Sequence, residues 1–221
     1  MAAPILQPGN SMASPIILYT NREYSSPYVL SVYATLVEKG LPFELRSIDL
    51  GSGQNLEPEY RRLSLTSRVP TLLHGEFSLS ESSAIVEYLE DAFTPPDFPS
   101  VYPRDTRQRA RARQIQAWVR SDLGALREER QTTVIYGARN PQPLSEAGRR
   151  AADKLLSVAD TLIDEQGGDL FGSWSIADVD FSVMLNRLCA NGDPVPEKIR
   201  RYVDRQSERS CIKSWWALAR Q

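Results

Sequence analysis

The tripeptide Ser25-Ser26-Pro27 has the composition of a helix start that could stabilise an anion. Proline is favoured at the first position of a helix, where its missing N–H costs nothing, so Ser26 is expected to be the N-cap. Its hydroxyl would lie among free backbone N–H groups at the positive end of the helix dipole, which favours a thiolate over a thiol. An ordinary structural cap is the alternative. Ser25 and Tyr24 are near enough to compete for this role. Tyr19, at the end of the first strand, is a further candidate whose alternative is packing within the sheet, and the sequence leaves this choice open.

Val69 precedes Pro70 at the start of an apolar run, and this pair predicts an exposed stretch of backbone. An X–Pro bond can be cis at modest energetic cost, and a cis bond here would turn the Val69 N–H and C=O outward. A peptide-like ligand could pair with them as an added strand does. A simple turn before an edge strand is the alternative. The neighbouring Arg68 is either a carboxylate-binding or a solvated side chain.

Glu81 and Ser82 follow Ser80 and are expected in the first turn of another helix, where free N–H groups can receive an anion. The Ser82 hydroxyl could bind the same anion and Glu81 a cationic group, whereas a charge that only complements the helix dipole is the structural alternative. Ser175 and Asp178, by contrast, have the spacing of a capping box, and we expect them to stabilise a buried helix rather than to contact a ligand.

The inventory of reactive side chains excludes most other chemistry. The chain has one histidine and two cysteines, so it lacks the material for a typical zinc site, a Ser-His-Asp triad or a disulfide framework, and we expect no metal. The formal net charge is -2, and the arginines between residues 104 and 130 lie on different helix faces, which argues against nucleic-acid binding.

Hydrophobic periodicity places these motifs on two different halves. The first half predicts strands at 15–19, 43–48, 71–73 and 77–79 with helices at 27–39 and 81–92, a thioredoxin-like α/β layout. The second half predicts helices alone, at about 104–134, 145–165, 175–189 and 196–219. A proline-rich stretch between them is typical of a linker. The expected organisation is a flexible arm at 1–14, an α/β domain at 15–94, a linker at 95–103 and an all-helical bundle domain at 104–221.

An α/β half without an active-site cysteine, followed by a helical half of this size, resembles the cytosolic glutathione transferases. The resemblance spans residues 16–190 and rests on four motifs in order: Ser25-Ser26-Pro27-Tyr28, Arg68-Val69-Pro70, Glu81-Ser82-Ser83-Ala84-Ile85 and Ser175-Ile176-Ala177-Asp178. The arginine-rich run at 109–118, with Arg127-Glu128-Glu129-Arg130, is most similar to the bacterial YfcF-type glutathione transferases.

The resemblance implies a role for each candidate residue. Val69 would pair with the cysteinyl backbone of glutathione, Arg68 would reach its glycyl carboxylate, and Ser26 would stabilise its thiolate. Ser82 would bind the γ-glutamyl carboxylate and Glu81 the γ-glutamyl ammonium group. Glutathione would be the co-substrate, with no other cofactor, and the protein would be a homodimer.

The function implied is attack of the glutathione thiolate on an electrophile or an organic hydroperoxide, with disulfide reduction as a further activity. The second substrate would lie between the halves, where Trp118, Arg120 and Asp122 are candidate neighbours. A non-enzymatic partner-binding protein that keeps the fold is the alternative. Without a basic secretory start or a continuous apolar span in the first 21 residues, we expect a cytoplasmic protein that does not enter a membrane.

Overall fold

The structure is a computed structural model that describes residues 14–219. The expected arm at 1–14 therefore lies outside the described residues, apart from Ser14. The strands are β1 (Ile16–Asn21), β2 (Glu44–Ile48), β3 (Thr71–His74) and β4 (Phe77–Ser80). The helices are α1 (Pro27–Glu38), α2 (Pro58–Leu63), α3 (Ser82–Ala92), α4 (Thr106–Ser121), α5 (Gly124–Glu129), α6 (Glu146–Leu162), α7 (Ile176–Asn191), α8 (Glu197–Ser207) and α9 (Ser210–Leu218), with 3-10 turns η1 (Gln54–Leu56) and η2 (Thr132–Tyr136).

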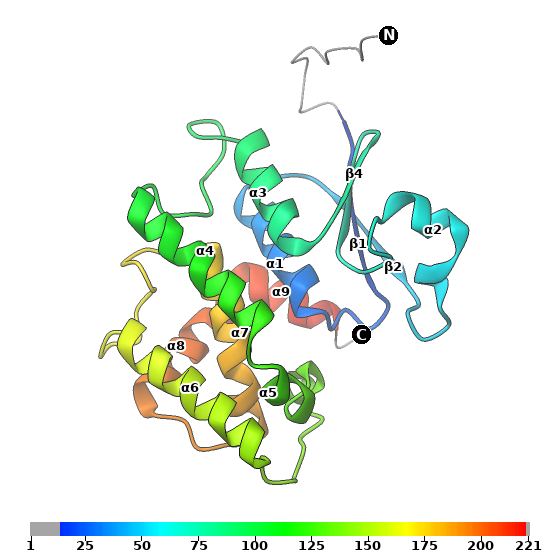
Figure 1. The fold of residues 1–221 in the computed structure, drawn as a ribbon. Helices are drawn as coiled ribbons and strands as arrows, with labels where there is room; N and C mark the ends of the chain where they lie inside the picture. Colours follow the sequence, from blue (N-terminus) through cyan, green and yellow to red (C-terminus); the bar gives the residue numbers. More distant parts are fainter. Residues whose placement is uncertain (1–13, 220–221) are drawn as a thin grey trace.

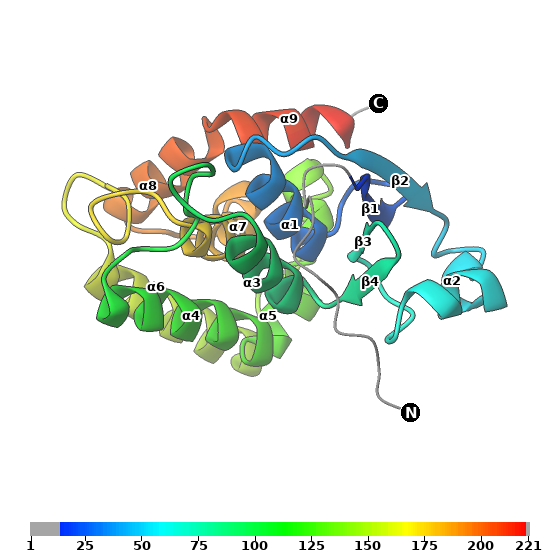
Figure 2. The same cartoon turned by 90° about the horizontal axis from the view of Figure 1, so that it is seen from above.

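The strands form one sheet in the order β2-β1-β3-β4. β1 and β2 run parallel because α1 crosses between them, whereas β3 and β4 are an antiparallel hairpin whose turn contains Gly75 at φ 60°. Figures 1 and 2 show α1 and α3 between the sheet and the helical half, and α2 at the outer side of the sheet. The predicted fold class, a thioredoxin-like α/β unit followed by a helical bundle, is confirmed.

The helix α2 and the turn η1 were not expected, since the sequence between 49 and 70 lacks the periodicity of a longer element. α2 has only 6 residues and begins at Pro58, which suits a first helical position. Its one buried residue is Tyr60, whose ring meets Tyr19 edge-on at 5.6 Å between centroids. A single buried anchor gives no repeat for a sequence pattern to reveal.

Two predicted helices, 104–134 and 196–219, are wrong as continuous elements. The first breaks after α4, where Leu123 has a left-handed backbone at φ 60° and donates its N–H to the Asp122 side chain at 2.8 Å. The second breaks at Arg209, whose extended backbone separates α8 from α9. In the first case a local polar contact ends a helix although apolar residues continue beyond it.

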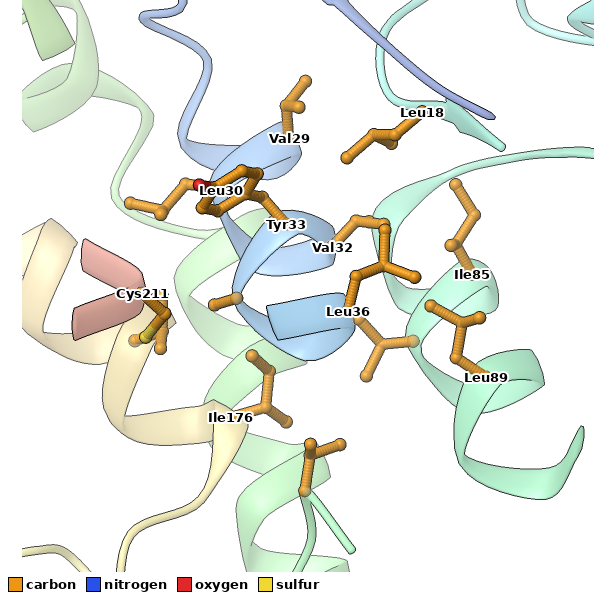
Figure 3. Close-up of a cluster of buried hydrophobic side chains, with 14 of the residues drawn as sticks. Leu18, Val29, Leu30, Val32, Tyr33, Leu36, Ile85, Leu89, Ile176 and Cys211 are labelled. Atoms are coloured by element: carbon orange, nitrogen blue, oxygen red, sulfur yellow. The ribbon is translucent and has the colours of Figure 1, made fainter. Parts of the chain in front are cut away.

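A single core joins the two halves of the molecule. One face of α1 meets the sheet and α3, where Leu18, Ile85 and Leu89 are buried, and the other meets helices of the second half (Figure 3). Trp215 of α9 and Ile176 of α7 belong to this same cluster and are fully buried. A second cluster lies within the helical half alone. Because the main core is shared, the division into domains at residues 94 and 104 stays a prediction.

No helix within residues 14–219 combines the length and the apolar character needed to span a bilayer.

Candidate functional site

Three loops leave the sheet at the same end, and the strand register requires this. Tyr19 of β1 pairs with Thr71 of β3, and Thr71 pairs in turn with Ser80 of β4. The segment after β1, the segment before β3 and the segment after β4 therefore start from neighbouring points. These segments carry the candidate site residues at 25–26, 68–69 and 81–82.

Ser26 is the N-cap of α1, as the sequence predicted. Its Oγ accepts a hydrogen bond from the Val29 N–H at 3.4 Å, and its own N–H donates to the Asn21 side chain at 3.1 Å. Its hydroxyl proton makes no other contact among the described residues and can be donated to a ligand. The half-buried Ser26 thus combines the positive end of the α1 dipole with a free O–H.

The two rivals of Ser26 have different surroundings. The Ser25 Oγ accepts a hydrogen bond from the Asn21 Nδ2 at 2.9 Å, so its proton is also available for donation. Tyr19 instead faces α2 through its contact with Tyr60, on the side of the sheet away from α1. Sequence reasoning missed Asn21, the last residue of β1, whose side chain holds both serines in place.

The Val69–Pro70 peptide bond is cis, one of the two geometries that the sequence allowed. Neither the N–H nor the C=O of Val69 makes a hydrogen bond to any residue between 14 and 219. The chain before it is held by polar contacts from η1 and α2: Asn55 Nδ2 donates to the Ser67 C=O at 2.9 Å, and the Tyr60 hydroxyl donates to the Arg68 C=O at 3.0 Å. The unexpected turn and helix thus fix the loop, and the Val69 N–H and C=O remain without a partner among the described residues.

The start of α3 presents free backbone donors together with two candidate side chains. The helix begins at Ser82, one residue later than expected, and Glu81 is the capping position with φ 75°. The Glu81 side chain is exposed, as is that of Arg68, and among the described residues neither has a hydrogen-bonding or ionic partner. Ser82 is buried, and its Oγ accepts from the Arg120 Nε at 3.4 Å.

Three residues in these loops have strained backbone conformations. Tyr24, Ser67 and Glu81 have φ of 49°, 54° and 75°, in the left-handed region that non-glycine residues seldom adopt. Each lies within two residues of a candidate site residue. Such conformations cost of order 1 kcal/mol or more and persist where the surrounding structure holds them, often at ligand sites.

Arg120 of α4 brings the helical half to this site. Its guanidinium pairs with Asp180 of α7 at 2.8 Å and also reaches Ser31 of α1 at 3.3 Å. The two other candidate neighbours of the second substrate lie elsewhere. Trp118 donates its Nε1–H to Asp122 at 2.9 Å and lines a groove between α4 and α6, and the bond from Lys154 to Asp122 lowers the pKa of that carboxyl to about 2.

Neither cysteine belongs to the site. Burial raises the pKa of the Cys211 thiol to about 12 and that of Cys189 to about 11, so neither is an effective nucleophile at neutral pH. Within the described part of the chain, no three His, Cys, Asp or Glu side chains gather as a metal site would need. The polar groups that the site presents are hydroxyls, backbone donors, the Glu81 carboxylate and guanidinium groups.

Comparisons with known proteins agree with this arrangement. Residues 23–97 match the glutathione S-transferase N-terminal domain and residues 105–221 match the glutathione S-transferase C-terminal domain. A glutathione transferase homologue from Burkholderia, solved with bound glutathione, is 45% identical and superposes with a TM-score of 0.76 over 93% of this chain and 98% of its own.

Several curated relatives are glutathione S-transferases of the theta class. Mouse glutathione S-transferase theta-1 is 30% identical over 173 residues, which are 76% of this chain and 71% of the relative. Human glutathione S-transferase theta-2B is 33% identical over 130 residues, which are 57% of this chain and 52% of the relative, so this chain spans about half of its length. With both halves matched in order, the chain belongs to the glutathione S-transferase family.

Proposed function

We propose that this protein is a glutathione transferase that binds glutathione at the end of the sheet and activates its thiol. The observation that carries the proposal is the unpaired Val69 N–H and C=O, which lie at the same end of the sheet as the N-termini of α1 and α3. A γ-glutamyl tripeptide needs a backbone partner in its middle and charged partners at its ends. The glutathione found in the Burkholderia homologue supports the assignment.

Each part of glutathione has a complementary group in this site. Val69 pairs with the cysteinyl N–H and C=O, as an added strand would. The γ-glutamyl carboxylate binds the free N–H groups of α3 and the Ser82 hydroxyl, while the γ-glutamyl ammonium binds Glu81. Arg68, exposed beside Val69 and without a carboxylate partner among the described residues, binds the glycyl carboxylate.

The thiol is activated at the start of α1. The Ser26 hydroxyl donates to the sulfur while its Oγ accepts from Val29, and the α1 dipole favours the negative charge. Ser25, oriented by Asn21, is the alternative donor. In conjugation, the sulfur forms a bond to the electrophilic carbon, the leaving group departs with its bonding electrons, and the thiol proton passes to solvent.

With a hydroperoxide, the sulfur attacks the peroxide oxygen and an alcohol leaves. A second glutathione then converts the glutathione sulfenate to the disulfide and water. Reduction of small disulfides uses the same thiolate. We further propose a cytoplasmic homodimer of the bacterial YfcF-type subgroup, with glutathione as co-substrate, no other cofactor, and domains at 15–94 and 104–221 joined by the linker 95–103.

The proposal is tested by measuring glutathione binding together with turnover. The purified full chain should bind glutathione and use it against at least one of chlorodinitrobenzene, an organic hydroperoxide and a small disulfide. Binding without any turnover would favour a partner-binding protein instead, and absence of both would contradict the proposal.

The ligand orientation has a separate test. Arg68→Met should weaken glutathione binding about threefold to tenfold through loss of one exposed charged contact, yet leave binding of γ-glutamylcysteine, which lacks the glycyl carboxylate, unchanged. The matched control is Arg104→Met, since Arg104 is exposed and lies just before α4, away from the site. An equal loss for both ligands would refute the assigned direction of the tripeptide.

A further inference from the structure

A small cavity at the start of α1 is lined by an excess of positive charge. Pro27 and Tyr28 form its wall on the α/β side, directly after Ser26. Arg120, Arg127 and Arg187 line the other side, from α4, α5 and α7. The helices that supply these walls meet where the two halves of the molecule join (Figure 1).

The cationic charge in this cavity is only partly balanced. Asp180 is the one carboxylate in its lining, and it already accepts bonds from Arg120 at 2.8 Å and from Gln116 at 2.6 Å. Arg127 has no carboxylate partner among residues 14–219: its guanidinium binds the C=O groups of Val119 and Asp122 at the end of α4. These carbonyls, at the negative end of a helix, offset part of one charge.

Arg187 is the most unusual member of the group. It is 4% exposed, and within the described chain its guanidinium binds the Arg130 C=O at 2.8 Å and the Thr132 hydroxyl at 2.7 Å but no carboxylate. Its Nε is buried without a hydrogen-bonding partner. Burial lowers the pKa of Arg187 to about 10, as expected for a cation held in a poorly hydrated place. A buried cation without a carboxylate partner is costly, and an anion bound beside it would offset part of that cost.

The other residues that line the cavity indicate which kind of anion fits it. Val119, Val183 and Met184 are apolar, so the cavity suits an organic anion with an apolar body better than a hydrated inorganic ion. The enclosed space is about 20 Å³, which is room for roughly one water-sized group. One oxygen of an anionic group can therefore enter, while the rest of the ligand must lie outside against the rim, beside Ser26.

We propose that this cavity binds the anionic group, such as a carboxylate, of the second substrate, and that Arg127 and Arg187 make the enzyme selective for negatively charged electrophiles. The inference rests on the proposed transferase function, because that function places a second substrate beside Ser26. The guanidinium groups contact the substrate at a group that does not react, so they set specificity and position rather than activate the thiol.

A binding experiment tests the cavity without requiring catalysis. Dinitrobenzoate and dinitrobenzamide have nearly the same shape but differ in charge, and their dissociation constants for the full chain can be measured by calorimetry with glutathione present and absent. The wild-type protein should bind dinitrobenzoate about tenfold or more tightly than dinitrobenzamide, as one charged hydrogen-bonded contact provides. Equal affinities would overturn the proposal.

Substitutions then test which arginines cause the preference for dinitrobenzoate over dinitrobenzamide. Arg187→Met and Arg127→Met should each reduce the charge preference about tenfold, whereas Arg139→Met should keep it. Arg139 is a suitable control because its guanidinium also binds a backbone C=O, that of Ala190 at 3.0 Å, but does not line this cavity. If Arg187→Met fails to fold, the charge preference of Arg127→Met alone tests the proposal, because Arg127 is only half-buried. A preference that survives in Arg127→Met overturns the assignment.

Salt competition shows whether the cavity binds an organic anion or an inorganic ion. Turnover shows whether the bound anion is a substrate. Sodium chloride should displace dinitrobenzoate no better than an equal ionic strength of sodium gluconate, and specific displacement by chloride would assign the cavity to an inorganic ion instead.

For turnover, Arg127→Met should lower kcat/KM for chlorodinitrobenzoate about tenfold but that for chlorodinitrobenzene less than about threefold. If the wild-type protein uses glutathione against neither compound, nor against a hydroperoxide or a small disulfide, the transferase proposal fails, while the binding comparison still decides whether the cavity selects anions.

Discussion

Replacement of Asp178 by alanine should destabilise the fold more strongly than loss of an ordinary helix cap. The Asp178 side chain is 0% exposed. It accepts hydrogen bonds from the Leu170 N–H and the Ser175 N–H, both at 2.9 Å, and from the Ser175 and Tyr202 hydroxyls, both at 3.1 Å. Alanine would leave several of these donors buried without an acceptor.

The size of the effect follows from two opposing contributions. Each buried donor left unsatisfied costs about 1 to 3 kcal/mol, whereas removal of a buried carboxylate relieves its desolvation. Burial raises the pKa of Asp178 to about 6 despite these hydrogen bonds, so at neutral pH ionisation of this carboxyl costs on the order of 3 kcal/mol more in the fold than in the unfolded chain. We therefore expect a net loss of about 2 to 4 kcal/mol at pH 7, compared with about 0.5 to 2 kcal/mol for a typical cap.

The pH dependence has a definite sign. Because the folded pKa lies above the unfolded value of 3.8, the folded protein holds this proton more tightly. The stability that Asp178 contributes is therefore complete below the unfolded pKa, falls as the pH rises to about 6, and is constant above. The loss caused by Asp178→Ala should be about 1 kcal/mol larger at pH 5 than at pH 7.

Reversible urea unfolding at both pH values measures this difference, and calorimetry measures glutathione affinity on the folded variant. Asp153→Ala is the control, because Asp153 is exposed on α6 and should change stability by less than about 0.5 kcal/mol. Unchanged stability with lost glutathione affinity would refute the structural role of Asp178. A loss that grows with pH would refute the assigned direction of its pKa.

Three other perturbations probe separate parts of the structure. Lys39 is buried and bonds to Glu90 at 2.8 Å, so Lys39→Met should cost about 3 to 5 kcal/mol in chemical unfolding, and adding Glu90→Gln should restore much of it. Cys189 and Cys211 should resist alkylation at neutral pH in the native protein and react only after unfolding, as mass spectrometry can show; rapid native labelling would contradict their raised pKa values. Asn21→Ala should lower turnover more than stability, because Asn21 orients the two serines; a melting temperature that falls while turnover stays intact would contradict this role.

The helix starts could be predicted from sequence because their determinants are local. Pro27 after Ser26 specifies a cap within three residues, and Ser175 with Asp178 does the same for α7. Pro70 likewise allows a cis bond before it, but the adjacent residues alone did not decide between cis and trans.

The remaining features depend on contacts between distant residues. Tyr60 holds the loop before Val69 from a helix too short to show periodicity, and Arg120 reaches Ser82 across the interface between the halves. The cavity beside Ser26 depends on Arg127 and Arg187, which are far apart in sequence, so only their meeting in the fold reveals the excess charge.

The most direct test of the central claim is the ionisation of glutathione bound to the protein, followed by the ultraviolet absorbance of its thiolate as the pH is raised. A free thiol has a pKa of about 8.5, and a value about two units lower in the complex corresponds to up to about 30-fold more thiolate at neutral pH, or roughly 2.7 kcal/mol. Ser26→Ala should raise the bound pKa by about one to two units and lower turnover about tenfold or more, since one hydrogen bond to a charged acceptor is worth about 1.5 to 3 kcal/mol. Ser25→Ala and Tyr19→Phe should have smaller effects. A bound thiol that titrates like free glutathione, or a pKa that responds to Tyr19→Phe but not to either serine, would contradict thiolate activation at the start of α1.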